Sequence, residues 1–428
     1  MSIRDSVPAV RDTTAAWWRP PDTLPPAPIR RRLTRFAVAP MARRLGIRVM
    51  LPDGRVLGGT DQQTPLMRLN RPEALYRRFG AFGPIGFGES YQAGEWDADD
   101  LAALLTTVAG HLRSIAPKPV LWLTRFQARG RRSLETRNTP WAAARNVRHH
   151  YDLPEELFAL FLDETMTYSA AIFPTDAAGR PQADEAQLPA AQRHKIDRLL
   201  DLAGVGPGIQ LLEIGTGWGA LAVAAARRGA HVHTVTLSVN QCRAARMRAA
   251  EAGVADRVRV ELCDYRDIRP HRANGYDAIV SAEMLEGVGG EFWPDYFTAL
   301  DRLLAPGGRA AIQTITMRHD DMLATRAKDT WIHRYIFPGG LIPSVSAIEA
   351  ACRRHTRLRV HRVGSYGSHY AATLRLWRER FDRHADDVAA LGLDRAFQRT
   401  WHLYLAYSEA GFAAGHLDVE HLLLDRAS

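Results

Sequence analysis

The chain has 428 residues, of which 46% are apolar and 24% charged. This composition is typical of a globular protein, and the length exceeds the roughly 100–200 residues of one domain, so we expect two units. The three cysteines are too scattered for a disulfide framework or a metal site, so we expect neither. A net charge of +9 favours acidic partners, but no nucleic-acid-binding module is recognisable and we expect no such partner.

The chain is predicted to divide into four segments. Residues 1–29 are rich in proline, and we expect a disordered tail there. Residues 30–120 are expected to form a small α+β unit associated with lipid or membrane, and residues 121–145 an arginine-rich linker. Residues 146–428 are expected to form the larger, catalytic unit.

The first unit begins with a strongly basic stretch, residues 30–48, which contains no acidic residue. Apolar residues alternate with the arginines, which leaves two interpretations open. The stretch is either a solvated basic face beside the core or an interfacial segment drawn to anionic lipid, at about 1 kcal/mol per basic residue near a membrane surface. The arginines are Arg30, Arg31, Arg32, Arg35, Arg43, Arg44 and Arg48.

Four further elements are predicted in this unit. Asp53-Gly54 lies between apolar runs and predicts a hairpin over residues 48–57. Residues 71–78 and 101–112 are expected to be helices. Residues 82–91 between them are expected to be a glycine-rich loop that carries aromatic side chains.

The second unit contains the most informative stretch of the chain, residues 211–219. An apolar run of strand type ends in Gly215, Gly217 and Gly219, and an alanine-rich helical run follows directly. Glycine permits unusual backbone angles and a close approach of ligand to backbone. The start of the helix offers free N–H groups and the positive end of the helix dipole.

Strand-like runs alternate with helical segments after this loop. Such alternation predicts a parallel, doubly wound sheet that binds its ligand at the carboxyl ends of the strands. A dinucleotide site would place its third glycine one residue later and an acid after the second strand, which instead ends in Thr236-Leu237-Ser238. The predicted strands are residues 231–237, 258–263, 276–282 and 309–316.

Asp264 follows the strand-like run at residues 258–263, and Pro306-Gly307-Gly308 precedes the run at residues 309–316. Together with the glycine loop, this set resembles the class I methyltransferases that use S-adenosylmethionine (SAM). The resemblance implies that the Asp264 carboxylate accepts a hydrogen bond from the adenine amino group, while the loop accommodates the amino-acid end of SAM.

Further motifs, at residues 86–96, 163–169, 236–241, 283–289 and 335–340, narrow the resemblance. Together they resemble the cyclopropane-fatty-acyl-phospholipid synthase family, which includes the mycolic-acid methyltransferases, over about residues 30–420. The SAM contacts that this resemblance implies are Tyr168, Ser169, Gly215, Gly217, Trp218, Gly219, Thr236, Leu237, Ser238, Gln241, Asp264, Tyr265 and Arg266.

The family transfers the sulfonium methyl group to the double bond of an unsaturated acyl chain, and a bound bicarbonate then removes a proton. At the positions of the usual bicarbonate ligands this sequence has Ala170, Glu286, Gln313, Ile315 and Tyr370. Ala170 stands where the family has cysteine and Gln313 where it has histidine, so we expect an altered base site. In it, Glu286 either holds bicarbonate or a water together with Tyr370 and Gln313, or takes the proton itself.

Gln313, together with Gly287 where the family commonly has a histidine after the glutamate, resembles the subgroup that makes 10-methyl or 10-methylene fatty acids. The leading interpretation is therefore methyl transfer that gives a mid-chain methylene product, which a partner reductase could saturate. Two alternatives stay open: a cyclopropane synthase, and a SAM-fold lipid-binding protein without catalysis.

The expected partners are a phospholipid with an unsaturated acyl chain and an anionic membrane surface, with a homo-oligomer as a further option. No apolar run is long enough to cross a bilayer and no signal-peptide layout is present, so we expect a cytoplasmic protein on the inner face of the plasma membrane.

Overall fold

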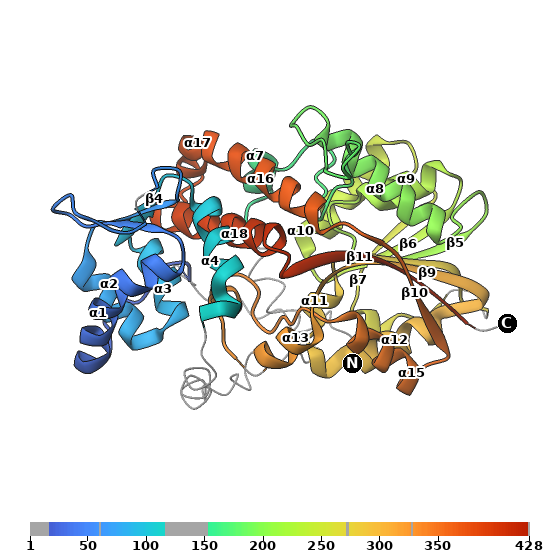
Figure 1. Cartoon of the computed structure of the whole chain (residues 1–428). Helices are drawn as coiled ribbons and strands as arrows, with labels where there is room; N and C mark the ends of the chain where they lie inside the picture. The colour runs from blue at the N-terminus through green and yellow to red at the C-terminus, as the bar shows by residue number, and fades with distance from the viewer. Residues whose placement is uncertain (1–16, 60, 116–152, 271–273, 327, 427–428) are drawn as a thin grey trace.

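The computed structural model describes residues 17–59, 61–115, 153–270, 274–326 and 328–426. The expected linker at residues 121–145 lies outside these ranges, as do residues 1–16 of the expected tail. The described chain builds a small sheet near its start and a larger sheet in its second part, with long helices between them (Figure 1).

The small sheet has the strand order β2-β1-β3-β4. β1 and β2 form the predicted hairpin, and Gly54 in its turn has a φ of +85°. The two predicted helices are present and longer than expected, as α2 and α4. The elements are α1 (Pro28–Arg44), β1 (Arg48–Met50), β2 (Val56–Gly58), β3 (Leu66–Leu69), α2 (Pro72–Phe82), α3 (Pro84–Gln92), β4 (Trp96–Ala98) and α4 (Leu101–Ile115).

The prediction of a glycine-rich loop over residues 82–91 is wrong, because α3 occupies most of that stretch. Gly83, with a φ of +58°, ends α2, and Pro84 starts α3 at once. The glycines of α3 serve close packing instead. A Cβ atom on Gly88 would lie 2.4 Å from Cδ1 of Trp331.

The prediction of a disordered tail over residues 1–29 is also wrong for its described part, residues 17–29. Trp18 packs against the C-terminal part of the chain, where its indole Nε1 donates to Oδ1 of Asp394 at 2.9 Å. Its carbonyl accepts from the side chains of Gln92 and Thr400. Trp18 thereby links the first unit to a helix of the second.

The large sheet has seven strands in the order β10-β11-β9-β8-β5-β6-β7. All neighbouring pairs from β9 to β7 are parallel, whereas β11 runs antiparallel to both β9 and β10, so the expectation of a wholly parallel sheet is corrected at this edge. The strands are β5 (Gln210–Ile214), β6 (His231–Thr236), β7 (Val258–Leu262), β8 (Tyr276–Ala282), β9 (Leu304–Met317), β10 (Leu358–Ser365) and β11 (Leu417–Arg426).

Helices cover both faces of this sheet, as predicted. α8 and α9 lie on one face and α12 and α15 on the other (Figure 1). Successive strand residues point to opposite faces, so Leu211 of β5 packs with α8 and α9 while Leu212 packs with α12 and α15. The chain order reverses between β5 and β8, which places a crevice at their carboxyl ends. The helices are α8 (Leu188–Leu202), α9 (Ala220–Arg227), α10 (Val239–Glu251), α12 (Trp293–Leu303) and α15 (Val345–His355).

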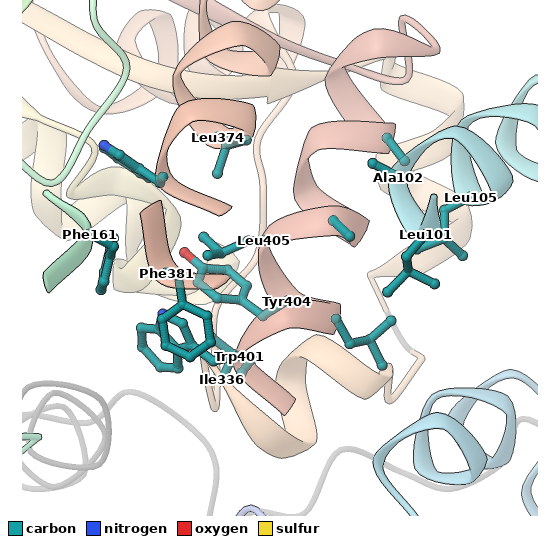
Figure 2. Packing of buried hydrophobic residues seen from close by; sticks show 14 of the residues in the cluster. Leu101, Ala102, Leu105, Phe161, Ile336, Leu374, Phe381, Trp401, Tyr404 and Leu405 are labelled. Atoms are coloured by element: carbon teal, nitrogen blue, oxygen red, sulfur yellow. The ribbon is translucent and has the colours of Figure 1, made fainter. Parts of the chain in front are cut away.

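One buried core joins the two units. α18 (Arg395–Ala413) packs between α4 of the first unit and α16 (Gly367–Arg383), and Figure 2 shows Leu101 and Leu105 on one side of it and Phe381 on the other. α7 (Glu155–Phe161) and α17 (Ala385–Ala390) complete this layer. Burying such apolar side chains stabilises the fold by about 1.5–3 kcal/mol each, so the units depend on each other for their cores.

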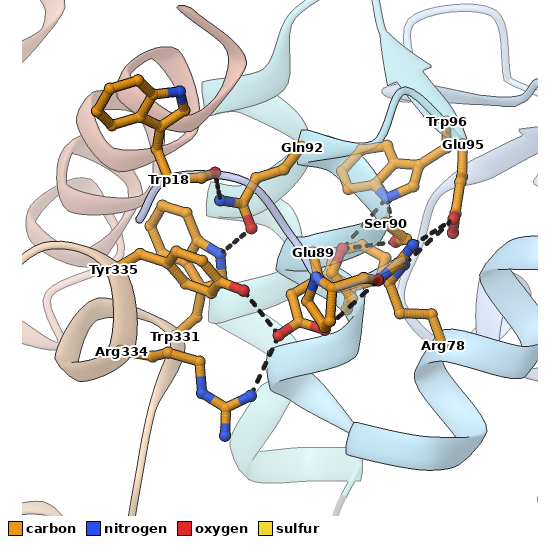
Figure 3. Close-up of polar contacts among 12 residues, drawn as sticks. Trp18, Arg78, Glu89, Ser90, Gln92, Glu95, Trp96, Trp331, Arg334 and Tyr335 are labelled. Atoms are coloured by element: carbon orange, nitrogen blue, oxygen red, sulfur yellow. Dashed lines mark hydrogen bonds and ion pairs between the residues drawn. The ribbon is translucent and has the colours of Figure 1, made fainter. Parts of the chain in front are cut away.

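Polar contacts also bind α14 (Trp331–Tyr335), a helix of the second unit, to α3 of the first (Figure 3). The indole of Trp331 donates to Gln92 at 2.9 Å, and the Tyr335 hydroxyl donates to the buried carboxylate of Glu89 at 2.9 Å. Arg334 pairs with the same carboxylate at 3.2 Å. This contact between α3 and α14, which we call the α3–α14 latch, fixes a segment that continues to the site described next.

Candidate active site

A cavity lies at the carboxyl ends of β5, β6 and β8, where the sheet topology places a ligand. Most of the side chains that were predicted to contact SAM line it. These are Tyr168, Ser169, Gly215, Gly217, Trp218, Thr236, Leu237, Gln241 and Tyr265. Gly219, Ser238, Asp264 and Arg266 are not on its wall, and each has a different role nearby.

The three glycines of the loop all have positive φ values but differ in what surrounds them. Gly217 borders the cavity, and a Cβ atom there would meet nothing within 4 Å. A Cβ atom on Gly219 would lie 2.9 Å from Cα of Ala245, so Gly219 allows α9 and α10 to pack closely. Space for a ligand is therefore kept at Gly217, and Gly219 is a packing residue.

Ser238 and Asp264 hold backbone rather than face the cavity. Ser238 is the N-cap of α10 and accepts from the backbone N–H of Gln241. Asp264 caps the short helix at Tyr265–Asp267, and its carboxylate binds the Arg266 guanidinium with contacts of 2.8 and 2.6 Å. The pair positions Tyr265 on the wall, and the predicted contact of Asp264 with adenine has no support from this arrangement.

A half-buried residue that the sequence analysis did not select, Glu283, carries the carboxylate at the centre of the polar site. It follows β8 directly and lines the cavity. The backbone N–H of Ala170, the amide Nε2 of Gln313 and the hydroxyl of Tyr370 each donate to it at 2.8 Å. Burial raises the pKa of Glu283, and its three donors and Lys195 oppose that rise. An acid directly after a central strand was the available sequence signal.

Lys195 of α8 is the second ionisable group on the wall that sequence reasoning missed. It is 1% exposed, and its ammonium donates to Oγ of Ser169. Burial lowers the pKa of Lys195 to about 8, while the nearby carboxylates of Glu283 and Asp163 act in the opposite direction. Among the described residues, no group of His, Cys, Asp or Glu side chains is arranged to hold a metal ion.

Tyr370 and Gln313, which were predicted to act with Glu286, bind Glu283 instead. Oε1 of Glu286 instead accepts from the hydroxyl of Thr314 at 3.0 Å and from the backbone N–H of Ile315. Its Oε2 has no hydrogen-bond partner within the described ranges, and Glu286 is not on the cavity wall. Burial, with a smaller contribution from Glu283, raises the pKa of Glu286 to about 8.

The five residues of the expected base site are thus divided between two carboxylates. Ala170, Gln313 and Tyr370 surround Glu283, and Ile315 binds Glu286. The backbone carbonyl of Glu286 also accepts from the N–H of Leu341 at 2.8 Å. Glu286 therefore holds β9 and the segment after α14 in place behind the cavity.

Several known proteins are similar to this chain in sequence, in fold or in both. The family described as mycolic acid cyclopropane synthetase matches residues 139–422. The chain is 52% identical to the tuberculostearic acid methyltransferase of Mycobacterium tuberculosis, over 90% of this chain and 89% of that protein. It is 30% identical to the cyclopropane-fatty-acyl-phospholipid synthase of Escherichia coli, over 84% of this chain and 87% of that protein.

A solved structure of mycolic acid cyclopropane synthase, complexed with SAH and CTAB, matches with a TM-score of 0.58 and 31% identity. The match covers 66% of this chain and 97% of that one. The fold, the cavity at Gly217 and the SAH in this related structure all support SAM as the ligand of the cavity.

Replacing Gly217 with valine should remove SAM binding, because the new side chain would enter the cavity from a backbone with a φ of +51°. We expect SAM affinity to fall by more than about tenfold, the equivalent of 1.4 kcal/mol, in isothermal titration calorimetry. Gly219→Ala is the matched control. It should lower the melting temperature, because the new Cβ atom would meet Ala245, and leave SAM affinity close to that of the parent. Unchanged SAM affinity in Gly217→Val would show that SAM does not use this loop.

Glu286 should also make stability depend on pH. The folded protein keeps this carboxyl protonated up to about pH 8, whereas the unfolded chain loses the proton near its ordinary pKa of 4.5. The folded state therefore binds more protons between these values, and stability falls as pH rises through this window. Glutamine cannot titrate, so the melting temperature of Glu286→Gln should rise relative to that of the parent as the pH increases from 5 to 8. A gap that stays constant over this range contradicts the assignment.

Proposed function

This chain belongs to the mycolic acid cyclopropane synthetase family and is a SAM-dependent methyltransferase, and we propose that it methylates the double bond of an unsaturated acyl chain in a phospholipid. The observation that carries the proposal is the carboxylate of the half-buried Glu283, which three donors hold on the wall of the SAM cavity. When bound, SAM supplies an electrophilic methyl group.

An alkene is a weak nucleophile, so the chain must exclude water and stabilise positive charge on the acyl chain. Aromatic side chains on and behind the wall are suited to both tasks. The hydroxyls of Tyr168 and Tyr404 are hydrogen-bonded at 2.8 Å, and the ring centroids of Tyr370 and Phe412 lie 4.6 Å apart. Trp218 lines the cavity and is 3% exposed. We propose that these rings enclose the reacting carbons.

We propose that Glu283 receives the proton that the reaction releases. A new C–C bond forms as the C–S bond to the methyl group breaks, which leaves positive charge on the neighbouring chain carbon. A hydride shift moves this charge to the methylated carbon, and a proton then leaves the added methyl group for the Glu283 carboxylate. The two electrons of that C–H bond form the C=CH2 double bond of a mid-chain methylene product.

Two features support Glu283 over a bound bicarbonate as the base. The groups expected to hold bicarbonate, Ala170, Gln313 and Tyr370, already donate to Glu283. Burial also raises the pKa of Glu283, and a base with a raised pKa is a better proton acceptor. The similarity to the tuberculostearic acid methyltransferase supports methyl transfer to a fatty acyl chain. A partner reductase would saturate a methylene product to a methyl branch.

The proposed setting is the inner face of the plasma membrane, where phospholipid acyl chains are available. Within the described ranges, no helix combines the length and apolar character needed to span a bilayer. Two other functions remain as outcomes of experiment: cyclopropane synthesis, and lipid binding without catalysis.

Glu283→Gln tests the base directly. The substitution keeps size and the acceptor for Ala170 and Gln313, and its NH2 group would donate to the Tyr370 hydroxyl in place of accepting from it. It removes the proton acceptor, so methyl transfer should fall by about 10²–10⁴-fold, the usual contribution of positioned acid–base catalysis. The measurement is transfer of labelled methyl groups from SAM to phospholipid, with SAM affinity measured in parallel and expected to stay near that of the parent.

Glu286→Gln is the matched control, because Glu286 is an equally buried carboxylate that does not line the cavity. It should keep most of the activity. If Glu286→Gln loses methyl transfer and Glu283→Gln keeps it, the roles of the two carboxylates are reversed. If the parent binds SAM and lipid but transfers no methyl group under any condition, the protein is a lipid-binding protein.

A further inference from the structure

The outward side of α1 carries a stripe of exposed apolar side chains. Ile29, Leu33 and Phe36 are 74%, 63% and 75% exposed, and they follow each other at intervals of four and three residues. Residues at these intervals lie on one face of a helix. Large apolar side chains that gather on one exposed face mark an interaction surface more often than isolated ones do.

The opposite side of the same helix packs on the first unit. Ala42 is buried, and Val38 is packed against the core on the face turned away from the stripe. The backbone of Arg31 lies so close to α2 that a Cβ atom on Gly80 would be 3.0 Å from its nitrogen. The stripe is therefore not a core face left open by a missing neighbour, since α1 already has its core face.

Arginines flank the stripe on both sides. At 100° per residue, Arg32 and Arg43 lie along one edge of it and Arg30 along the other. All three are exposed, and α1 contains no acidic residue. α1 lies at the end of the molecule that is remote from the large sheet (Figure 1).

We propose that this face of α1, the α1 docking face, binds the surface of an anionic phospholipid bilayer. Ile29, Leu33 and Phe36 would enter the boundary between head groups and acyl chains, while the flanking guanidinium groups bind lipid phosphates. A bilayer presents phosphates at its surface and apolar chains beneath them. The helix face has matching groups, with apolar side chains along its centre and guanidinium groups at its edges. Nucleic acid would match the arginines and leave the three apolar side chains in water.

Docking at this face would bring the first unit to the membrane, and the shared core and the α3–α14 latch connect that unit to the cavity. The inference does not depend on the chemistry proposed for Glu283, because vesicle binding is measured without SAM or turnover. Failure of one proposal is therefore distinguishable from failure of the other.

The test is sedimentation of the full chain with vesicles of phosphatidylcholine alone or mixed with phosphatidylglycerol. The parent should bind the anionic vesicles more tightly. The double variant Leu33→Ser, Phe36→Ser should bind the anionic vesicles at least about tenfold more weakly, because two apolar side chains would no longer be buried in the bilayer. Because both side chains are exposed, circular dichroism and SAM affinity should match the parent.

Met247→Ser with Leu262→Ser is the control, since these apolar side chains are 56% and 49% exposed on the second unit. Its vesicle binding should equal that of the parent. Arg32→Gln with Arg43→Gln should weaken binding at low salt, with a smaller difference from the parent at high salt. Equal binding by the parent and the Leu33, Phe36 variant would overturn the proposal, as would binding that ignores lipid charge or retention on a nucleic acid but not on vesicles.

Discussion

A carboxylate can be buried only where donors replace the water it loses, and the site is arranged around this requirement at Glu283. Its donors come from three different parts of the chain: the segment at Ala170, β9 through Gln313, and α16 through Tyr370. Glu283 itself has a φ of +49°, a conformation that costs on the order of 1–3 kcal/mol for a residue other than glycine. Its surroundings therefore hold both its backbone and its side chain.

The network continues one layer further, to β11. Nε2 of His421 lies 2.8 Å from Oε1 of Gln313, and burial lowers the pKa of His421 to about 3, so this ring is neutral. Gln313 must donate through Nε2 to Glu283, which leaves its Oε1 to accept from the N–H of His421. Glutamine suits this position because its amide both accepts from the histidine and donates to the carboxylate.

Contacts between the two units extend to the site. The α3–α14 latch holds Trp331 and Tyr335, and the chain then passes Phe337, whose ring packs edge-on against Tyr404. A few residues later, the N–H of Leu341 donates to the carbonyl of Glu286. Contacts made by the first unit therefore reach Glu286 and, through its bond to Ile315, the strand β9 that carries Gln313.

Sequence patterns predicted much of this fold. The glycine loop and the limits of β6, β7 and β8 followed from apolar runs and turn residues, which are local properties. β9 begins at Leu304, ahead of the predicted start at residue 309. The helix α3 was missed because its glycines are explained by close neighbours such as Trp331, which lie far away in the sequence. Glu286 was preferred over Glu283 because of its place in the family motif. Only the fold shows that the donors at 170, 313 and 370 converge on the other acid.

The most direct test of this account is the structure of the product. Purified protein, SAM and a phospholipid with one cis double bond per acyl chain would be incubated, and the released fatty acids treated with ozone or with hydrogen over a catalyst. A methylene product and a cyclopropane have the same mass, but the methylene group is cleaved by ozone to a ketone and takes up hydrogen under mild conditions. We expect a product that is cleaved by ozone and also takes up hydrogen. A product of the same mass that resists both reagents would be a cyclopropane and would contradict this account.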